Sequence, residues 1–484
     1  MTNAPVDAAR TNAPADDTGR RTVVRLVFIL FWMLIFEGSV RKWVAPQFSA
    51  YLYFVRDPVL ICLYVVALRH GLFMRPRHFM TVGLIIAAIA TLLSAVHLAT
   101  GGQYTLLLAA YGFRNYFLYM PLPFIIGRCF TYDDLTRIAR FTMLAMIIAT
   151  PLAVLQFEAP RSSVLNRGIS TDQEYQFENL GSGGGRVRPA GTFTSVMGMT
   201  QLTVATVAML MWAWAVPRSR RPASPWLVRL AVLAAATALA VGGSRTSFVQ
   251  SCLVILTGIA ISPFLAGMGA KFKSFVAPSL AVVAFAILFP ILLPDAFQAF
   301  ADRWQSASEI ENQQFALGWA GRILYSFYDF SRLLGQVPAL GYGIGTGGNG
   351  AVAMGISFHG VNVLKLAEED WSRHVIELGP ALAIVFILYR ASFGAWVATR
   401  SLRATLNSGD PLPILLFAYC GVALVEGQIT GHGLVNGFGW LYVGICLAAG
   451  NVLSALPTDG SEPNSVDRPR ALTDTPSSFP NLMR

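Results

Sequence analysis

The sequence predicts an all-α polytopic membrane protein with about twelve transmembrane helices and one long, partly structured outer loop. Apolar residues make up 54% of the 484-residue chain and charged residues only 13%, whereas roughly a quarter of the residues in soluble domains are charged. Runs of about 18 or more apolar residues are typical of membrane-spanning helices. Twelve such runs cover residues 22–38, 51–68, 80–98, 104–127, 137–155, 191–216, 226–243, 247–267, 274–294, 375–396, 412–430 and 437–456.

The distribution of Lys and Arg predicts the topology of these spans. Of the 36 basic residues, 21 fall in the tails and alternate connections on one side, and seven fall in the short connections on the other side. Cytoplasmic loops carry the excess of basic residues in membrane proteins, so both termini are predicted to be cytoplasmic. The net charge of +10 is therefore a topology signal, and no nucleic-acid partner is expected.

The ends of the chain differ in composition from the bundle that they flank. Residues 1–21 and 457–484 are polar or proline-rich and are predicted to be disordered cytoplasmic tails, with the helical bundle at 22–456. No small-residue cleavage site follows the first apolar run, which favours a retained anchor. The five cysteines lie in or beside spans without metal-ligand spacing, so neither a metal nor a cofactor is expected.

Two outer loops interrupt the apolar pattern. The longer loop, residues 295–374, is polar and contains Arg322, a glycine-rich run at 341–350 and three successive acids at 368–370. Long loops in compact proteins are usually functional or disordered, and attachment to spans at both ends favours function. The second outer loop covers residues 156–190. The glycine-rich run lacks the βαβ surroundings of a dinucleotide site.

Charged residues also occur inside or at the ends of spans. Arg114 lies near the middle of an apolar run, where insertion costs about 2.5 to 3.5 kcal/mol. It is predicted either to form a buried pair with Asp57 or Glu37 or to contact an anionic ligand. Arg41, at the end of the first span, either anchors the helix at the interface or belongs to an outer site.

Four outer arginines are candidates for binding a diphosphate. Arg186 and Arg188 follow a run of glycines and precede a helix, an arrangement suited to phosphate, although a flexible hinge explains the same pattern. Arg245 lies in the tight turn 242–247, where an ordinary interfacial role is the alternative, and Arg322 lies in the long loop. Together with a nearby carboxylate for deprotonation, they predict a membrane transferase acting on a lipid diphosphate.

An ordered set of short motifs adds a family resemblance. The set comprises Arg-Val-Arg-Pro-Ala-Gly-Thr-Phe at 186–193, Gly-Gly-Ser-Arg-Thr-Ser at 242–247, Gly-Arg-Ile at 321–323, Leu-Gly-Tyr-Gly-Ile-Gly-Thr at 340–346 and Glu-Leu-Gly at 377–379. It resembles the O-antigen polymerase and O-antigen ligase family of bacterial inner membranes. The resemblance implies a metal-independent glycosyltransferase with an undecaprenyl-diphosphate-linked glycan as donor. It also implies that Arg188, Arg245 and Arg322 hold the diphosphate.

The long loop is expected to supply the catalytic base. The ligase branch carries a His-Asn pair about nine residues before its Glu-x-Gly, and here that register holds Glu368 and Glu369. His359 and His374 flank the position out of register. The departure favours the polymerase branch, with Glu368 or Glu369 as the base, while a solvated acidic cap on the following helix is the alternative. Glu377, His359 and His374 are secondary candidates, together with Arg41 and Arg114.

The predicted function is therefore a polysaccharide polymerase that joins lipid-linked repeat units at the outer face of the membrane. The alternatives are a ligase that transfers the glycan to lipid A core and, from another class, a secondary transporter. Transporters usually hold substrate at the midplane between repeated halves, and no internal repeat is visible. Expected partners are the lipid-linked glycan and the membrane, with a flippase and a chain-length regulator as candidates.

Overall fold

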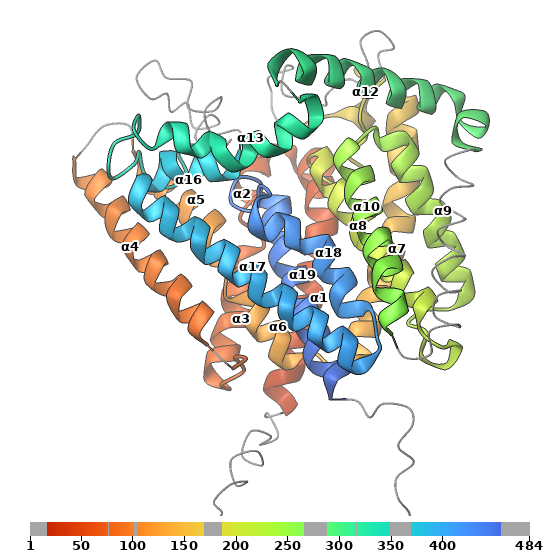
Figure 1. The fold of residues 1–484 in the computed structure, drawn as a ribbon, viewed down its shortest axis with the longest axis horizontal. Helices are drawn as coiled ribbons and strands as arrows, with labels where there is room; N and C mark the ends of the chain where they lie inside the picture. The colour runs from red at the N-terminus through yellow and green to blue at the C-terminus, as the bar shows by residue number, and fades with distance from the viewer. Residues whose placement is uncertain are drawn as a thin grey trace, which may run out of the picture.

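The chain forms a bundle of long apolar helices (Figure 1). The computed structural model describes residues 17–75, 77–100, 104–168, 186–265, 288–315, 317–348 and 369–455. In these ranges eight helices are long and apolar enough to cross a membrane, which confirms a helical membrane protein. They are α1 (Asp17–Ser39, continued by a π-helical turn, η2, Val40–Val44), α4 (His78–Thr100), α7 (Tyr132–Glu158), α8 (Val196–Ala215), α9 (Pro225–Gly242), α10 (Arg245–Ile261), α17 (Pro380–Ser408) and α19 (Gly433–Ser454).

The predicted count of twelve spans is not confirmed. Three of the expected spans form shorter or interrupted helices: α3 (Asp57–Arg69), the series α5 (Leu106–Phe113), η4 (Arg114–Leu118) and α6 (Leu122–Cys129), and α18 (Leu412–Val425). The 51–68 run begins its helix late because Pro58 occupies the first turn, a position that proline favours. The 104–127 run is broken by a π-helical turn and by Pro121. The expected span at 274–294 lies mostly outside the described residues.

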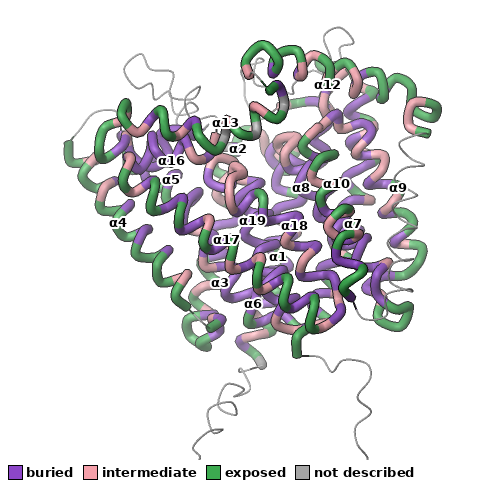
Figure 2. Tube along the Cα trace, viewed as in Figure 1, coloured by how far each residue is buried: buried purple, intermediate pink, exposed green. Residues whose placement is uncertain are grey.

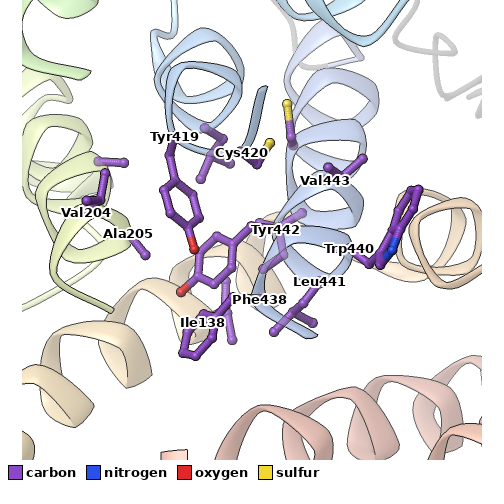
Figure 3. Close-up of a cluster of buried hydrophobic side chains, with 14 of the residues drawn as sticks. Ile138, Val204, Ala205, Tyr419, Cys420, Phe438, Trp440, Leu441, Tyr442 and Val443 are labelled. Carbon is purple, nitrogen blue, oxygen red and sulfur yellow. The ribbon is translucent and has the colours of Figure 1, made fainter. Parts of the chain in front are cut away.

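Helix α19 lies at the centre of the bundle and packs against α6, α17 and α18. Its middle is almost completely buried, as is that of α8, and Figure 2 shows this buried interior beside exposed outer helices. The rings of Tyr419 and Tyr442 meet edge to face with centroids 5.0 Å apart, and Phe438 stacks on Tyr442 (Figure 3). The Tyr442 hydroxyl lies 2.7 Å from the Thr142 hydroxyl, which ties α19 to α7.

The loops gather at two opposite ends of the bundle (Figure 1). At one end, the start of α1 meets the α6–α7 connection through Arg20, whose Nη1 donates to the Cys129 carbonyl at 3.2 Å. The end of α19 meets the same connection through Asn451, whose Nδ2 donates to the Gly127 carbonyl at 2.7 Å. We call this end the basic end, because Arg20, Arg128 and Arg140, which are expected to be cytoplasmic, lie there, and the opposite end the α12 end.

The long polar loop contributes three described helices to the α12 end. They are α12 (Pro294–Gln314), α13 (Gly318–Leu333) and α16 (Asp370–Leu378); residues 349–368 lie outside the described ranges. Helices α12 and α13 lie across the end of the bundle (Figure 1). The span expected to begin at residue 375 instead begins at Pro380, because Gly379 has a positive φ of 76° that separates α16 from α17.

The glycine-rich run packs tightly against helices instead of forming an open phosphate loop. Gly343 and Gly345 have φ values of 95° and 94°. A Cβ on Gly345 would lie 2.6 Å from the Leu108 carbonyl oxygen of α5, and one on Gly343 would lie 2.5 Å from the Tyr104 ring. These glycines therefore let the run lie between α5 and the α16–α17 junction.

Candidate functional site

Two of the four predicted diphosphate arginines meet at the α12 end. Arg245 Nη1 and Nη2 donate to Glu311 Oε2 and Oε1 at 2.9 and 2.8 Å. Arg322 Nη1 donates to Glu311 Oε1 at 3.0 Å. We call these three residues the arginine clamp. The structure thus brings together residues from α10, α12 and α13.

Local structure explains why these side chains meet. Ser244 caps α10, its hydroxyl accepting a hydrogen bond from the Ser247 amide at 3.2 Å, so that Arg245 begins the helix at the bundle end. Glu311 lies in the last turn of α12 and Arg322 near the start of α13. The two helices are joined at Gly318, whose φ of 52° suits glycine. The α12–α13 connection therefore delivers Glu311 and Arg322 to Arg245.

The charges in the clamp are unequally exposed. The Glu311 side chain is 2% exposed, whereas those of Arg245 and Arg322 are 20% and 45% exposed. Burial raises the pKa of Glu311, but the hydrogen bonds from Arg245 and Arg322 outweigh it and hold that pKa below its ordinary value. Glu311 is therefore ionised at neutral pH, and the two guanidinium groups lie on its solvent side.

Arg186 lies apart from the clamp. Its guanidinium donates to Glu158 at 2.6 Å and to Asp295 at 3.3 Å, and its Cζ lies 4.9 Å from the Phe157 ring centroid. Asp295 and Glu311 are at opposite ends of α12, about 24 Å apart along the helix axis at 1.5 Å per residue. Both carboxylates are more exposed than Arg186. The structure therefore does not bring Arg186 together with Arg245 and Arg322.

Arg188 precedes a buried segment that packs on α1. Lys42 Nζ donates to the Gly191 carbonyl at 3.1 Å, and Gln156 Nε2 donates to the same carbonyl at 3.2 Å. The Gly191 φ of 57° shapes this turn. The Arg188 side chain is half-buried beside it, which leaves its role in diphosphate binding a prediction.

Of the two candidate bases, the structure describes one. Glu368 lies outside the described residues, as does His359. Glu369 is half-buried at the N-cap of α16, and its side chain hydrogen-bonds to Glu426, the residue that follows α18. Burial, and then the charge of Asp370, raise the pKa of Glu426. Two carboxyl groups in contact share a proton more readily than they ionise together, so this pair suits proton transfer.

Beneath this pair lies a buried ionic network centred on Asp370. Arg373 Nη1 and the Thr430 hydroxyl donate to Asp370 Oδ1 at 3.1 and 2.8 Å, and Arg390 donates to Oδ2. Burial raises the pKa of Asp370, but the charges of Arg390 and Arg373 and the hydrogen bond from Thr430 hold it below its ordinary value. The network fixes α16 to α17 and to the connection after α18.

His374 and Glu377 belong to the same interior. Burial lowers the pKa of His374 to about 3, so the ring is neutral at physiological pH. Arg390 Nη1 lies 2.6 Å from His374 Nε2, and a guanidinium can only donate, so Nε2 accepts and Nδ1 carries the proton. Nδ1 lies 3.0 Å from the Tyr116 hydroxyl, and Tyr116 in turn contacts Glu377. His374 and Glu377 therefore both lie in the protein interior.

Arg41 and Arg114 form buried pairs beside α1. Arg114 Nε donates to Asp57 Oδ2 at 2.7 Å, which is one of the partners expected from the sequence. Arg41 Nη1 donates to Glu37 Oε1 at 3.0 Å, and Arg56 Nε lies 2.6 Å from Glu37 Oε2. This group is held inside the bundle near the α12 end.

The connection between α18 and α19 joins these groups. His432 Nε2 lies 3.0 Å from the Ser195 hydroxyl at the start of α8, and Asn436 Nδ2 donates to the Asn115 carbonyl at 2.6 Å. A Cβ on Gly431 would collide with the Arg373 guanidinium. One short connection therefore lies between the Asp370 network and the arginines beside α1.

Three residues of this region were not predicted from the sequence. Glu311 is one acid among several in the long loop, Arg390 falls among the basic residues of a predicted cytoplasmic segment, and Glu426 belongs to no motif. A signal existed for Arg390, because a charge eleven residues into a span requires a partner. No short-range signal links Glu311 to Arg245, since 66 residues separate them.

Comparisons with protein-family models, with curated proteins and with solved structures find no match to this chain.

Proposed function

We propose that this protein is a polysaccharide polymerase that transfers a glycan from a polyprenyl-diphosphate carrier to an acceptor sugar at the outer face of the membrane. The observation that carries the proposal is the arginine clamp, in which Arg245 and Arg322 share the buried carboxylate of Glu311. The clamp lies at the end of the bundle opposite the basic end (Figure 1). A positively charged site at the outer end of membrane helices suits a lipid-linked diphosphate.

The clamp places its guanidinium groups on the solvent side of a buried carboxylate. A guanidinium has five N–H donors in a planar fork that matches phosphate oxygens. Glu311 takes two of these donors from Arg245 and one from Arg322. Glu311 thus orients both arginines and offsets one of their two charges. In the proposal a diphosphate contacts both guanidinium groups from the solvent side.

The reaction consists of one displacement at the anomeric carbon of the donor. The acceptor hydroxyl oxygen attacks that carbon and forms the new C–O bond. The bond between the carbon and the diphosphate oxygen breaks, and its electron pair leaves with the diphosphate, whose growing charge Arg245 and Arg322 stabilise. Removal of one such donor typically slows a reaction by a factor of about 100 to 1,000.

Glu369 takes the proton of the acceptor hydroxyl in this proposal. Burial and the charge of Asp370 raise the pKa of its neighbour Glu426. In this proposal the proton shared by the pair lies on Glu426, which hydrogen-bonds to the ionised Glu369 and orients it. Glu368, outside the described residues, is the alternative base.

The assay supplies lipid-diphosphate-linked repeat units to the purified protein in liposomes and follows the length of the lipid-linked product. A ladder of longer lipid-linked glycans is expected. Transfer to lipid A core alone would indicate a ligase, and passage of substrate across the membrane without bond formation would indicate a transporter. Either result would overturn the proposal.

Two substitutions at the carboxyl pair test the proposed base. Glu369→Gln should abolish the ladder, whereas Glu426→Gln should retain it, because an amide reproduces the N–H or O–H donor of a neutral carboxyl group. Both proteins should retain wild-type abundance in the membrane. Full activity of Glu369→Gln would transfer the base role to Glu368, which the corresponding substitution tests.

A further inference from the structure

We propose a second anion-binding site at the basic end, which holds the phosphate headgroup of an anionic lipid. A cavity of about 560 Å³ is lined by seven residues, four of which are arginines. The arginines come from α7, from the short helix η7 (Arg218–Arg220) and its following loop, and from α9. They are Arg140, Arg218, Arg221 and Arg229.

The charges of this cavity are uncompensated within the described residues. None of the four arginines forms an ion pair with a carboxylate in the part of the chain that the structure describes. Asp134 is instead paired to Arg20 at 3.3 Å. Asp133 and Asp410 lie near Tyr132 but form no ion pair with these four arginines in the described residues. Four guanidinium groups around one cavity repel one another unless an anion lies between them.

Hydrogen bonding in the cavity also points to a missing partner. Arg221 Nε is shielded from solvent and has no hydrogen-bond partner in the described residues. Buried donors in proteins are usually paired. Arg140 donates to the Pro222 carbonyl, which fixes the loop that carries Arg221. An anionic oxygen in the cavity would satisfy the Arg221 donor.

The position of the cavity favours a lipid over a soluble anion. It lies at the start of the spanning helix α9, beside Trp226, which is 69% exposed. Arg229 lies over the Trp226 ring at 5.2 Å, and Trp214 lines the adjoining cavity. Tryptophan is enriched where spanning helices meet the headgroup layer. Basic pockets between spanning helices on the cytoplasmic side are known to take anionic lipid headgroups.

Native mass spectrometry of the full-length protein in non-ionic detergent tests this inference. The probes are phosphatidylglycerol, phosphatidylcholine and soluble glycerol phosphate. We expect phosphatidylglycerol to bind in preference to phosphatidylcholine. The double variant Arg221→Gln/Arg229→Gln should weaken phosphatidylglycerol binding by about 25-fold, because each basic residue near a membrane surface contributes a factor of about five.

A matched control removes two other arginines from the same end. Arg69 and Arg403 are exposed and lie outside the cavity, so Arg69→Gln/Arg403→Gln should bind phosphatidylglycerol like the wild type. Equal weakening in both double variants would indicate a general charge effect and would refute the site. Binding of glycerol phosphate as tight as that of phosphatidylglycerol would refute the lipid assignment.

Discussion

Arg245 and Arg322 share one carboxylate but should contribute very differently to stability. The Arg245–Glu311 pair has two charge-assisted hydrogen bonds between side chains that are 20% and 2% exposed. Such bonds contribute roughly 1.5 to 3 kcal/mol each, and partial exposure of Arg245 lowers their sum, so we expect a coupling of about 2 to 3 kcal/mol. Arg322 makes one bond to Glu311 and is 45% exposed, so its coupling should be about 0.5 kcal/mol.

Double-mutant cycles measure these two couplings. Each cycle combines Arg245→Gln or Arg322→Gln with Glu311→Gln, and titration with SDS in mixed micelles gives the free energy of unfolding. Equal couplings, or a stronger one for Arg322, would contradict the geometry of the clamp.

Substitution of Arg322 should lower the activity of the protein strongly and its stability only slightly. Arg322→Gln should lower the rate of glycan lengthening by at least a factor of about 100 while costing less than about 1 kcal/mol in stability. Arg332→Gln is the matched control, because Arg332 lies on the same helix, is 57% exposed and forms one ion pair at 3.0 Å. A rate for Arg322→Gln no lower than that of the control would remove Arg322 from the diphosphate site.

Three further predictions concern stability. The fold lowers the pKa of Glu311, so its carboxylate stabilises the protein fully above the ordinary pKa of 4.5 and loses this contribution as the pH falls through the lower value. The melting temperature of the wild type should therefore approach that of Glu311→Gln in acid. A difference in melting temperature that does not change with pH would contradict this. Arg114→Leu should cost about 3 to 5 kcal/mol by leaving Asp57 buried without its partner, and SDS titration should show that the added change Asp57→Asn recovers part of the loss. Gly345→Ala should lower the free energy of unfolding by about 1 to 3 kcal/mol, because the positive φ and the nearby backbone exclude a side chain. At Gly335 a Cβ would meet open space, so Gly335→Ala should have a free energy of unfolding within about 0.5 kcal/mol of the wild type.

The fold could be predicted where hydropathy and helix continuity coincide. The run 437–456 contains neither proline nor charge, and α19 extends over nearly the same residues. The run 104–127 is as apolar, yet it breaks at Arg114 and Pro121. Hydropathy reports the cost of transferring side chains from water, whereas continuity depends on backbone hydrogen bonds and on partners for buried charges. Span counts from hydropathy alone therefore exceed the number of long helices.

The site could be predicted only as a set of residue types. Arginine at the start of a spanning helix indicates an anion site from local sequence, and Arg245 lies at such a position. The orientation of its guanidinium depends on Glu311, which α12 delivers from a distant part of the chain. Arg390 shows the converse, since charge counting assigned it to the cytoplasmic side while its guanidinium binds Asp370 at the α12 end.

The placement of acids relative to bases decides which outer arginines can meet a substrate. Two ion pairs of α12 and α13 have a buried carboxylate and an exposed guanidinium group, namely Glu311 with Arg322 and Asp329 with Arg332. In the Arg186 group the order is reversed, since both carboxylates are the more exposed partners. A diphosphate approaching α13 meets cations whose counter-charges lie behind them, whereas one approaching Arg186 meets carboxylates first. We therefore expect Coulomb repulsion to direct the proposed diphosphate substrate to the clamp and away from Arg186.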